Sequence, residues 1–62
     1  MLLRIVLDVL DGELKFENSQ SWPHLGERIQ TKQGTYEVIR VTHELNGPSV
    51  VTILTRKLYE RT

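Results

Sequence analysis

Residues 26–57 decide the fold, and they read GERIQTKQGTYEVIRVTHELNGPSVVTILTRK. Residues 27–31 have the composition of a short strand and residues 35–43, TYEVIRVTH, that of a long one. The connection between them, residues 32–34, is short and ends in glycine, as in a tight turn. This part of the chain therefore predicts an antiparallel hairpin.

The same stretch predicts a further strand after residue 48. Asn46-Gly47 would suit a two-residue turn, but Pro48 has no N–H to close it, so a longer loop is expected. A register that pairs Thr42 with Val50 places apolar side chains opposite one another, the pairs being Val41–Val51, Ile39–Ile53 and Val38–Leu54. Val38 and Ile39 are adjacent, so simple alternation fails there and the pattern predicts a bulge or strong coiling.

The N-terminal segment predicts another hairpin. Residues 2–10 are rich in Leu, Ile and Val, and Asp11-Gly12 after them favours a two-residue type I′ turn. That turn pairs Leu10 with Glu13 and Asp8 with Lys15. One face then carries the core residues Leu3, Ile5, Leu7, Val9, Leu14 and Phe16. The opposite face carries an apolar stripe, Leu2, Val6 and Leu10, which either the C-terminal segment covers or a second copy buries.

Residues 17–26 have the composition of a loop with at most a single helical turn. In the competing interpretation a short helix over residues 23–33 begins at Pro23 after a Ser21 cap. Trp22 has two interpretations of its own. It is either a lid that closes an open end of the core or, together with His24, part of an exposed binding surface.

Four to five mostly antiparallel strands with no strong helix signal predict an all-β domain over residues 1–62, either a small barrel or a β-roll. Residues 26–57 resemble small, mostly uncharacterised SH3-like barrel proteins of bacteria and phages. The similarity lies in a Gly-acid-x-aliphatic strand, a glycine turn and an aromatic-x-Val-x-x-Val strand. The resemblance implies an SH3-like barrel and leaves function open, because such barrels host many functions.

Composition narrows the functional classes. The chain has 62 residues, no cysteine, and eight basic and eight acidic residues, so its net charge is zero. So short a chain has a small core, which makes self-association an expected source of stability. The lack of cysteine and the interruption of the apolar N-terminus by Arg4 and Asp8 favour a cytoplasmic protein without a membrane segment.

No catalytic or metal-binding motif surrounds His24 or His43, and the acidic residues near the first turn have structural explanations. We therefore expect a non-enzymatic protein-interaction or assembly module with no cofactor, metal or small-molecule substrate. Its expected partner is a protein, with a second copy the leading candidate. The candidate contact residues are Trp22, His24, Leu2, Val6 and Leu10.

The alternative is a weak single-stranded nucleic-acid binder. It would combine an aromatic platform with a basic groove, and its residues would be Tyr36, Arg40, Arg56 and Lys57. The register above places Tyr36 close to Arg56. The neutral net charge argues against this alternative, because nucleic-acid binders carry a broad positive field.

Overall fold

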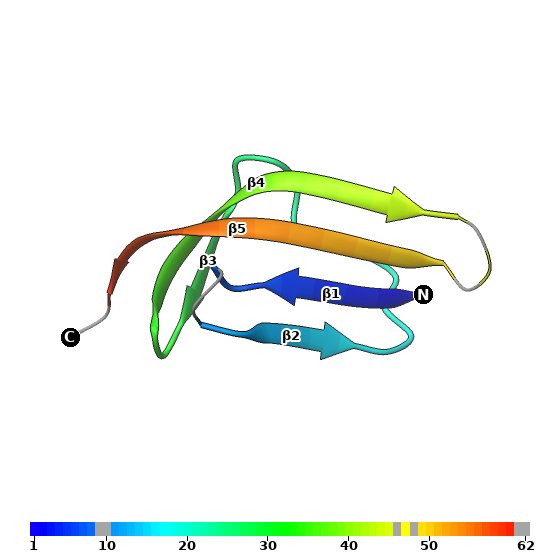
Figure 1. Ribbon diagram of the computed structural model, residues 1–62, viewed down its shortest axis with the longest axis horizontal. Helices are drawn as coiled ribbons and strands as arrows, with labels where there is room; N and C mark the ends of the chain where they lie inside the picture. Colours follow the sequence, from blue (N-terminus) through cyan, green and yellow to red (C-terminus); the bar gives the residue numbers. More distant parts are fainter. Residues whose placement is uncertain (9–10, 46, 48, 61–62) are drawn as a thin grey trace.

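The computed structural model describes residues 1–8, 11–45, 47 and 49–60. Its strands are β1 (Leu2–Val6), β2 (Glu13–Phe16), β3 (Arg28–Thr31), β4 (Gly34–Glu44) and β5 (Val50–Glu60) (Figure 1). The described residues contain no helix. The predicted all-β class is confirmed, whereas the helix over residues 23–33 is wrong, because β3 occupies that segment.

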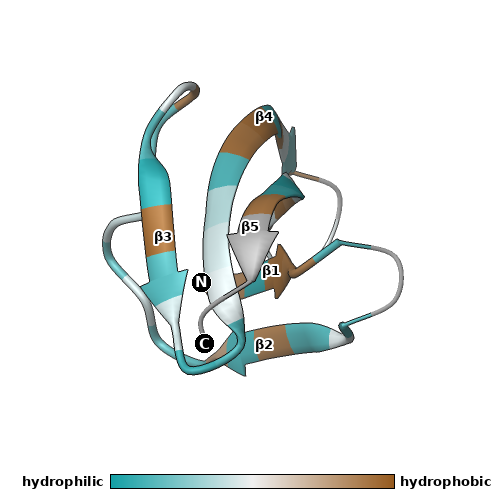
Figure 2. Ribbon diagram, turned by 90° about the vertical axis from the view of Figure 1, so that its left-hand side faces the viewer, coloured by the Kyte–Doolittle hydropathy of each residue, from teal (hydrophilic) through white to brown (hydrophobic). Residues whose placement is uncertain are grey.

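The strands form one curled sheet in the order β2-β1-β5-β4-β3. Figure 2 shows them following one another around an arc, so the molecule is a half-barrel. All neighbouring pairs are antiparallel except β1 and β5, which are parallel. This parallel ladder joins the two ends of the chain and places both hairpins in a single sheet.

The core lies on one face of the sheet, called the inner face below. Strands alternate their side chains between two faces, so every second residue of β1 points to the core. Leu3 and Ile5 are each 5% exposed, whereas Arg4 between them is exposed. The complete buried apolar set is Leu3, Ile5, Leu7, Tyr36, Val38, Val51 and Ile53.

The bulge predicted in the second hairpin strand is confirmed. Val38 pairs with Thr55 and Arg40 pairs with Leu54, so Ile39 is an extra residue on β4. Val38 is 1% exposed and Ile39 43% exposed, which shows that the two neighbours do not share an environment. The predicted β4–β5 register is wrong by two residues after the bulge, where Thr42 pairs with Thr52 and not with Val50, and by one residue before it, where Val38 pairs with Thr55.

The register of the first hairpin is also wrong, by four residues. Lys15 pairs with Arg4 and not with Asp8, and Val6, not Leu10, pairs with Glu13. The reason is that β1 ends at Val6 and β2 begins only at Glu13, with the Leu7 N–H donating to the Gly12 carbonyl at 2.9 Å. A shift by an even number of residues keeps each side chain on its face, so Leu14 and Phe16 still share the inner face with Ile5 and Leu3.

The loop between β2 and β3 lies against the inner face. It is attached at its start, where Ser19 N–H donates to the Met1 carbonyl at 2.9 Å. At its end Gly26 N–H donates to the Val38 carbonyl and Val38 N–H donates to the Glu27 carbonyl, both at 2.9 Å. Between these points the half-buried Trp22 packs against the core, the position that the lid interpretation expects.

Candidate interaction surface

The half-barrel is open between β2 and β3, and we call this opening the seam. These two strands are the first and the last of the sheet, and no ladder joins them in the part of the chain that the structure describes. Each therefore has one edge without a neighbouring strand. Free edges are surfaces on which another strand can pair, and proteins manage them explicitly for that reason.

Two apolar side chains line the seam on the β2 side. Leu14 is 37% exposed and Phe16 45% exposed, although both point to the inner face. Their cross-strand partners Ile5 and Leu3 are buried, because β5 lies on the other side of β1. The sequence correctly placed Leu14 and Phe16 on the core face, but the structure leaves both side chains partly exposed there.

The backbone of β2 divides its hydrogen-bonding groups between β1 and the seam. Hydrogen-bonded and non-hydrogen-bonded pairs alternate in an antiparallel ladder. Since Leu7 and Gly12 form a hydrogen-bonded pair, Leu14 and Phe16 direct their N–H and C=O groups toward β1. Glu13 and Lys15 therefore direct theirs toward the seam.

The same argument applies to β3. The bond from Val38 N–H to the Glu27 carbonyl belongs to a hydrogen-bonded position of the β3–β4 ladder. Ile29, two residues further on, consequently faces β4 with its backbone groups. Arg28 and Gln30 direct theirs toward the seam, while the Ile29 side chain shares the inner face with Tyr36.

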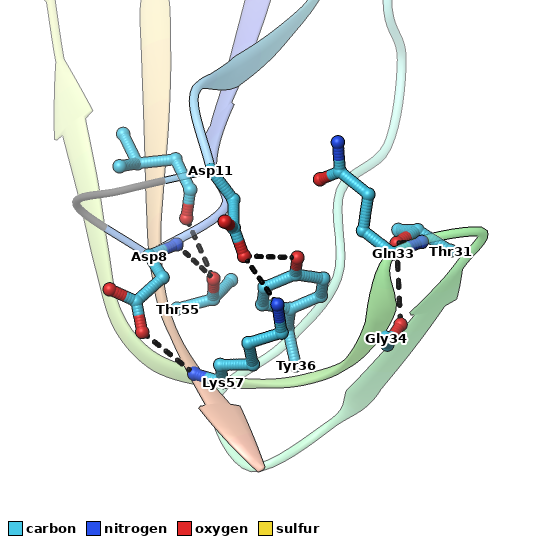
Figure 3. A network of polar contacts seen from close by, with 9 residues as sticks. Asp8, Asp11, Thr31, Gln33, Gly34, Tyr36, Thr55 and Lys57 are labelled. Atoms are coloured by element: carbon cyan, nitrogen blue, oxygen red, sulfur yellow. Dashed lines mark hydrogen bonds and ion pairs between the residues drawn. The ribbon is translucent and has the colours of Figure 1, made fainter. Parts of the chain in front are cut away.

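A groove of about 220 Å³ marks one end of the seam. It runs between the start of β2 and the β3–β4 turn, and its lining residues are Leu7, Asp11, Glu13, Leu14, Thr31, Lys32 and Gln33. The turn itself is held by the Thr31 hydroxyl, which accepts from Gln33 N–H at 3.1 Å and donates to the Gly34 carbonyl at 3.3 Å (Figure 3).

A polar network fixes the loop before β2 at this end of the seam (Figure 3). The Tyr36 hydroxyl donates to Asp11 Oδ2 at 2.7 Å, and Lys57 Nζ donates to the same oxygen at 2.8 Å. The Lys57 hydrogen bond, followed by that of Tyr36, lowers the pKa of the Asp11 carboxyl. Burial, reinforced by the hydrogen bond to Asp11, raises the pKa of the Tyr36 phenol.

Asp8 and Thr55 extend the network along β5. Asp8 has a positive φ of 57° and accepts from the Lys57 backbone N–H on Oδ2 at 3.2 Å. The Thr55 hydroxyl accepts from Asp8 N–H at 3.3 Å and donates to the Val6 carbonyl at 2.7 Å. Asp11 therefore connects the start of β2 to both β4 and β5, which explains why it does not serve as a hairpin turn.

Trp22 and His24 lie on the loop between β2 and β3. The Trp22 ring packs edge-on against His43, with centroids 5.3 Å apart, and a surface hollow of about 190 Å³ lies beside Gln20, Ser21, Trp22 and His24. His24 is exposed and contacts Glu27, whose Oε1 accepts from the His24 backbone N–H at 2.7 Å. That backbone hydrogen bond, followed by the His24 side chain, lowers the pKa of Glu27.

The predicted outer stripe is present in part. Leu2 and Val6 are half-buried on the face opposite the core, where they pair with Val50 and Leu54 of β5. Leu10 lies outside the described residues. The side chains of Val50 and Leu54 on β5 thus cover one side of the stripe. The sequence had left two candidates for this cover, the C-terminal segment and a second copy of the chain.

The four nucleic-acid candidates do not form one surface. Tyr36 is fully buried, so its ring cannot stack on a base, and Lys57 is bonded to Asp11. Arg56 lies opposite Glu37, with Nη2 at 3.0 Å from Oε1, and the predicted closeness of Arg56 to Tyr36 is wrong because Tyr36 pairs with Lys57. Arg40 is exposed beside the bulge.

The described residues include no group of three or more His, Asp or Glu side chains placed to hold a metal ion. Within the same residues, no helix is long and apolar enough to cross a membrane. The chain matches no protein-family model, no curated protein and no solved structure.

Proposed function

We propose that this protein is a non-enzymatic assembly module that binds a β-strand of another protein chain at the seam. The observation that carries the proposal is the exposure of Leu14 and Phe16 on the inner face of a sheet whose two edges are both free. Apolar groups in such a position are covered when a further strand joins the sheet.

The mechanism is strand addition. Main-chain hydrogen bonds to the free edge supply affinity, and alternate side chains of the added strand supply specificity by packing against the inner face. Glu13 and Lys15 offer the backbone groups on β2, and Arg28 and Gln30 offer those on β3. The hydrogen bonds from Tyr36 and Lys57 to Asp11 have a structural role in this mechanism, because they hold the start of β2 in place.

The seam supports this function better than the two surfaces expected from the sequence. Leu2 and Val6 are already half-covered by Val50 and Leu54, and Trp22 packs against the core of its own chain. We further propose that the protein is an SH3-like barrel and that it is cytoplasmic, since both properties fit an assembly module of this kind.

A peptide with the sequence of residues 27–33, ERIQTKQ, tests the proposal. It is added to the isotopically labelled chain at a protein concentration where light scattering gives the monomer mass. We expect saturable shifts of the Glu13 and Lys15 amide resonances. The control peptide carries Gln30→Pro, which removes an edge N–H and should bind far more weakly. Unchanged β2 resonances at millimolar peptide would overturn the proposal.

A further inference from the structure

The two edges of the seam are complementary in charge as well as in shape. β2 runs opposite to β3 through the sheet, so a β2 strand and a β3 strand from two copies can meet in antiparallel fashion. Glu13 is the first residue of β2 and Glu17 follows its last residue. In the same way Arg28 is the first residue of β3 and Lys32 follows its last residue. The structure records no ion pair for Glu17, Arg28 or Lys32 among the described residues.

Only one register satisfies both the backbone and the charges. The outward backbone groups belong to Glu13 and Lys15 on β2 and to Arg28 and Gln30 on β3, so permitted antiparallel registers differ by steps of two residues. Pairing Lys15 with Gln30 makes all of these groups face a partner. The resulting pairs are Glu13–Lys32, Leu14–Thr31, Lys15–Gln30, Phe16–Ile29 and Glu17–Arg28.

The neighbouring registers are repulsive. A slip of two residues in one direction sets Lys15 opposite Arg28, and a slip in the other direction sets it opposite Lys32. Like charges directly opposite one another destabilise a strand pair. Lys15 already lies opposite Arg4, and Glu13 forms ion pairs with both, so a second cation on the other side of Lys15 adds repulsion that nothing offsets. The register that avoids this repulsion sets both acidic residues opposite basic ones.

In this register the side chains that face one another also belong to the same face of the sheet. Leu14 and Phe16 belong to the inner face of β2, and Ile29 and Thr31 belong to the inner face of β3. They occupy the non-hydrogen-bonded positions, where opposed side chains approach most closely. Pairing Phe16 with Ile29 would cover the more exposed of the two apolar residues on β2.

We infer that the partner at the seam is a second copy of this chain, held by reciprocal β2–β3 pairing. This inference rests on the proposed function and identifies its partner. A two-fold axis running along the strands pairs β2 of each copy with β3 of the other. The two five-stranded half-barrels then close into one ten-stranded sheet with no free edge.

The competing outcome is closure of the seam within one chain, because the same register is available to β2 and β3 of a single copy. The Asp11 contacts to Tyr36 and Lys57 hold the start of β2, and a groove of about 220 Å³ separates it from the β3–β4 turn. The width of the opening is thus set by a network of hydrogen bonds within the chain.

Charge reversal at one pair separates these outcomes. Glu17→Arg and Arg28→Glu each place like charges in both seams of a symmetric dimer. We expect each single variant to raise the dimer dissociation constant on the order of a hundredfold. An equimolar mixture of the two variants should regain the wild-type mass, because each seam then joins opposite charges. Thr42→Glu is the control and should leave the dimer intact, because Thr42 is exposed on β4 and pairs with Thr52, away from both edges of the sheet.

Three results would overturn the inference. They are a wild-type chain that stays monomeric at every concentration, a dimer that neither reversal weakens, and single variants that fail to restore the dimer when mixed. Closure within one chain predicts the first of these. The proposed function fails separately, when the ERIQTKQ peptide leaves β2 of the monomer unchanged. Both variants should unfold with wild-type cooperativity, since Glu17 and Arg28 are exposed.

Discussion

The hydroxyl of the fully buried Tyr36 donates a 2.7 Å hydrogen bond to Asp11 across 25 residues of sequence. Lys57 Nζ reaches the same carboxylate oxygen at 2.8 Å. One side chain before β2 is thereby joined to both long strands of the sheet. The position of β2, and with it the geometry of the seam, depends on this carboxylate.

Acid titration should reveal the contribution of Asp11 to stability. The Lys57 and Tyr36 hydrogen bonds lower the pKa of Asp11 in the folded chain. A lowered pKa stabilises the fold above the pKa of the unfolded state, about 4, and this stabilisation is lost as the pH falls through the folded value. Asp11→Asn should be less stable than the wild type at neutral pH.

The same variant should also lose less stability on acidification. Urea unfolding followed at pH values from about 6 down to about 2 measures the difference. The remaining acid dependence in Asp11→Asn comes from groups such as Glu13 and Glu27, whose pKa values are also lowered. Parallel stability curves for the two proteins would show that Asp11 has no such role.

The bulge in β4 predicts opposite outcomes for two adjacent residues. Val38 is 1% exposed and Ile39 43% exposed. Val38→Thr buries a hydroxyl in the core and should lower the free energy of unfolding by about 1–3 kcal/mol. Ile39→Thr should change it by less than about 0.5 kcal/mol. Equal effects would mean that the Ile39 side chain is as buried as that of Val38.

The lid role of Trp22 can be separated from a general effect of the loop. Trp22 packs against the core, whereas Leu25 in the same loop is 68% exposed. Trp22→Ala should lower the free energy of unfolding by about 2 kcal/mol, less than for a fully buried tryptophan. Leu25→Ala is the matched control and should stay within about 0.5 kcal/mol of the wild type. If both variants lost the same stability, Trp22 would not be a lid.

The local sequence pattern was sufficient to predict the β3–β4 hairpin and the bulge in β4. The β3–β4 connection and the bulge at Val38–Ile39 both depend on neighbouring residues, namely a short turn and two adjacent apolar side chains. The β1–β2 register was wrong by four residues and the β4–β5 register by two residues after the bulge, whereas before the bulge it was wrong by one. Slips by even numbers preserve the inner and outer faces, so the apolar pattern that supported them could not detect the error, and the odd slip results from the extra residue Ile39.

The remaining features depend on contacts between distant residues. Asp11-Gly12 has the composition of a tight turn, but Asp11 bonds to Tyr36 and Lys57, and the paired strands end at Val6 and begin at Glu13. The parallel pairing of β1 with β5 has no signal in either strand alone. The seam was missed for the same reason, since the apolar alternation of Leu14 and Phe16 is identical in an open and a closed barrel.

The most direct test of the account is an isotope-filtered NMR experiment on a mixture of carbon-13-labelled and unlabelled wild-type chains. It detects contacts between chains only. The reciprocal register predicts cross-peaks between the Phe16 ring of one copy and the Ile29 methyl groups of the other, at a concentration where light scattering gives the dimer mass. A dimer whose Phe16–Ile29 contacts arise solely within one chain, or not at all, would contradict the account.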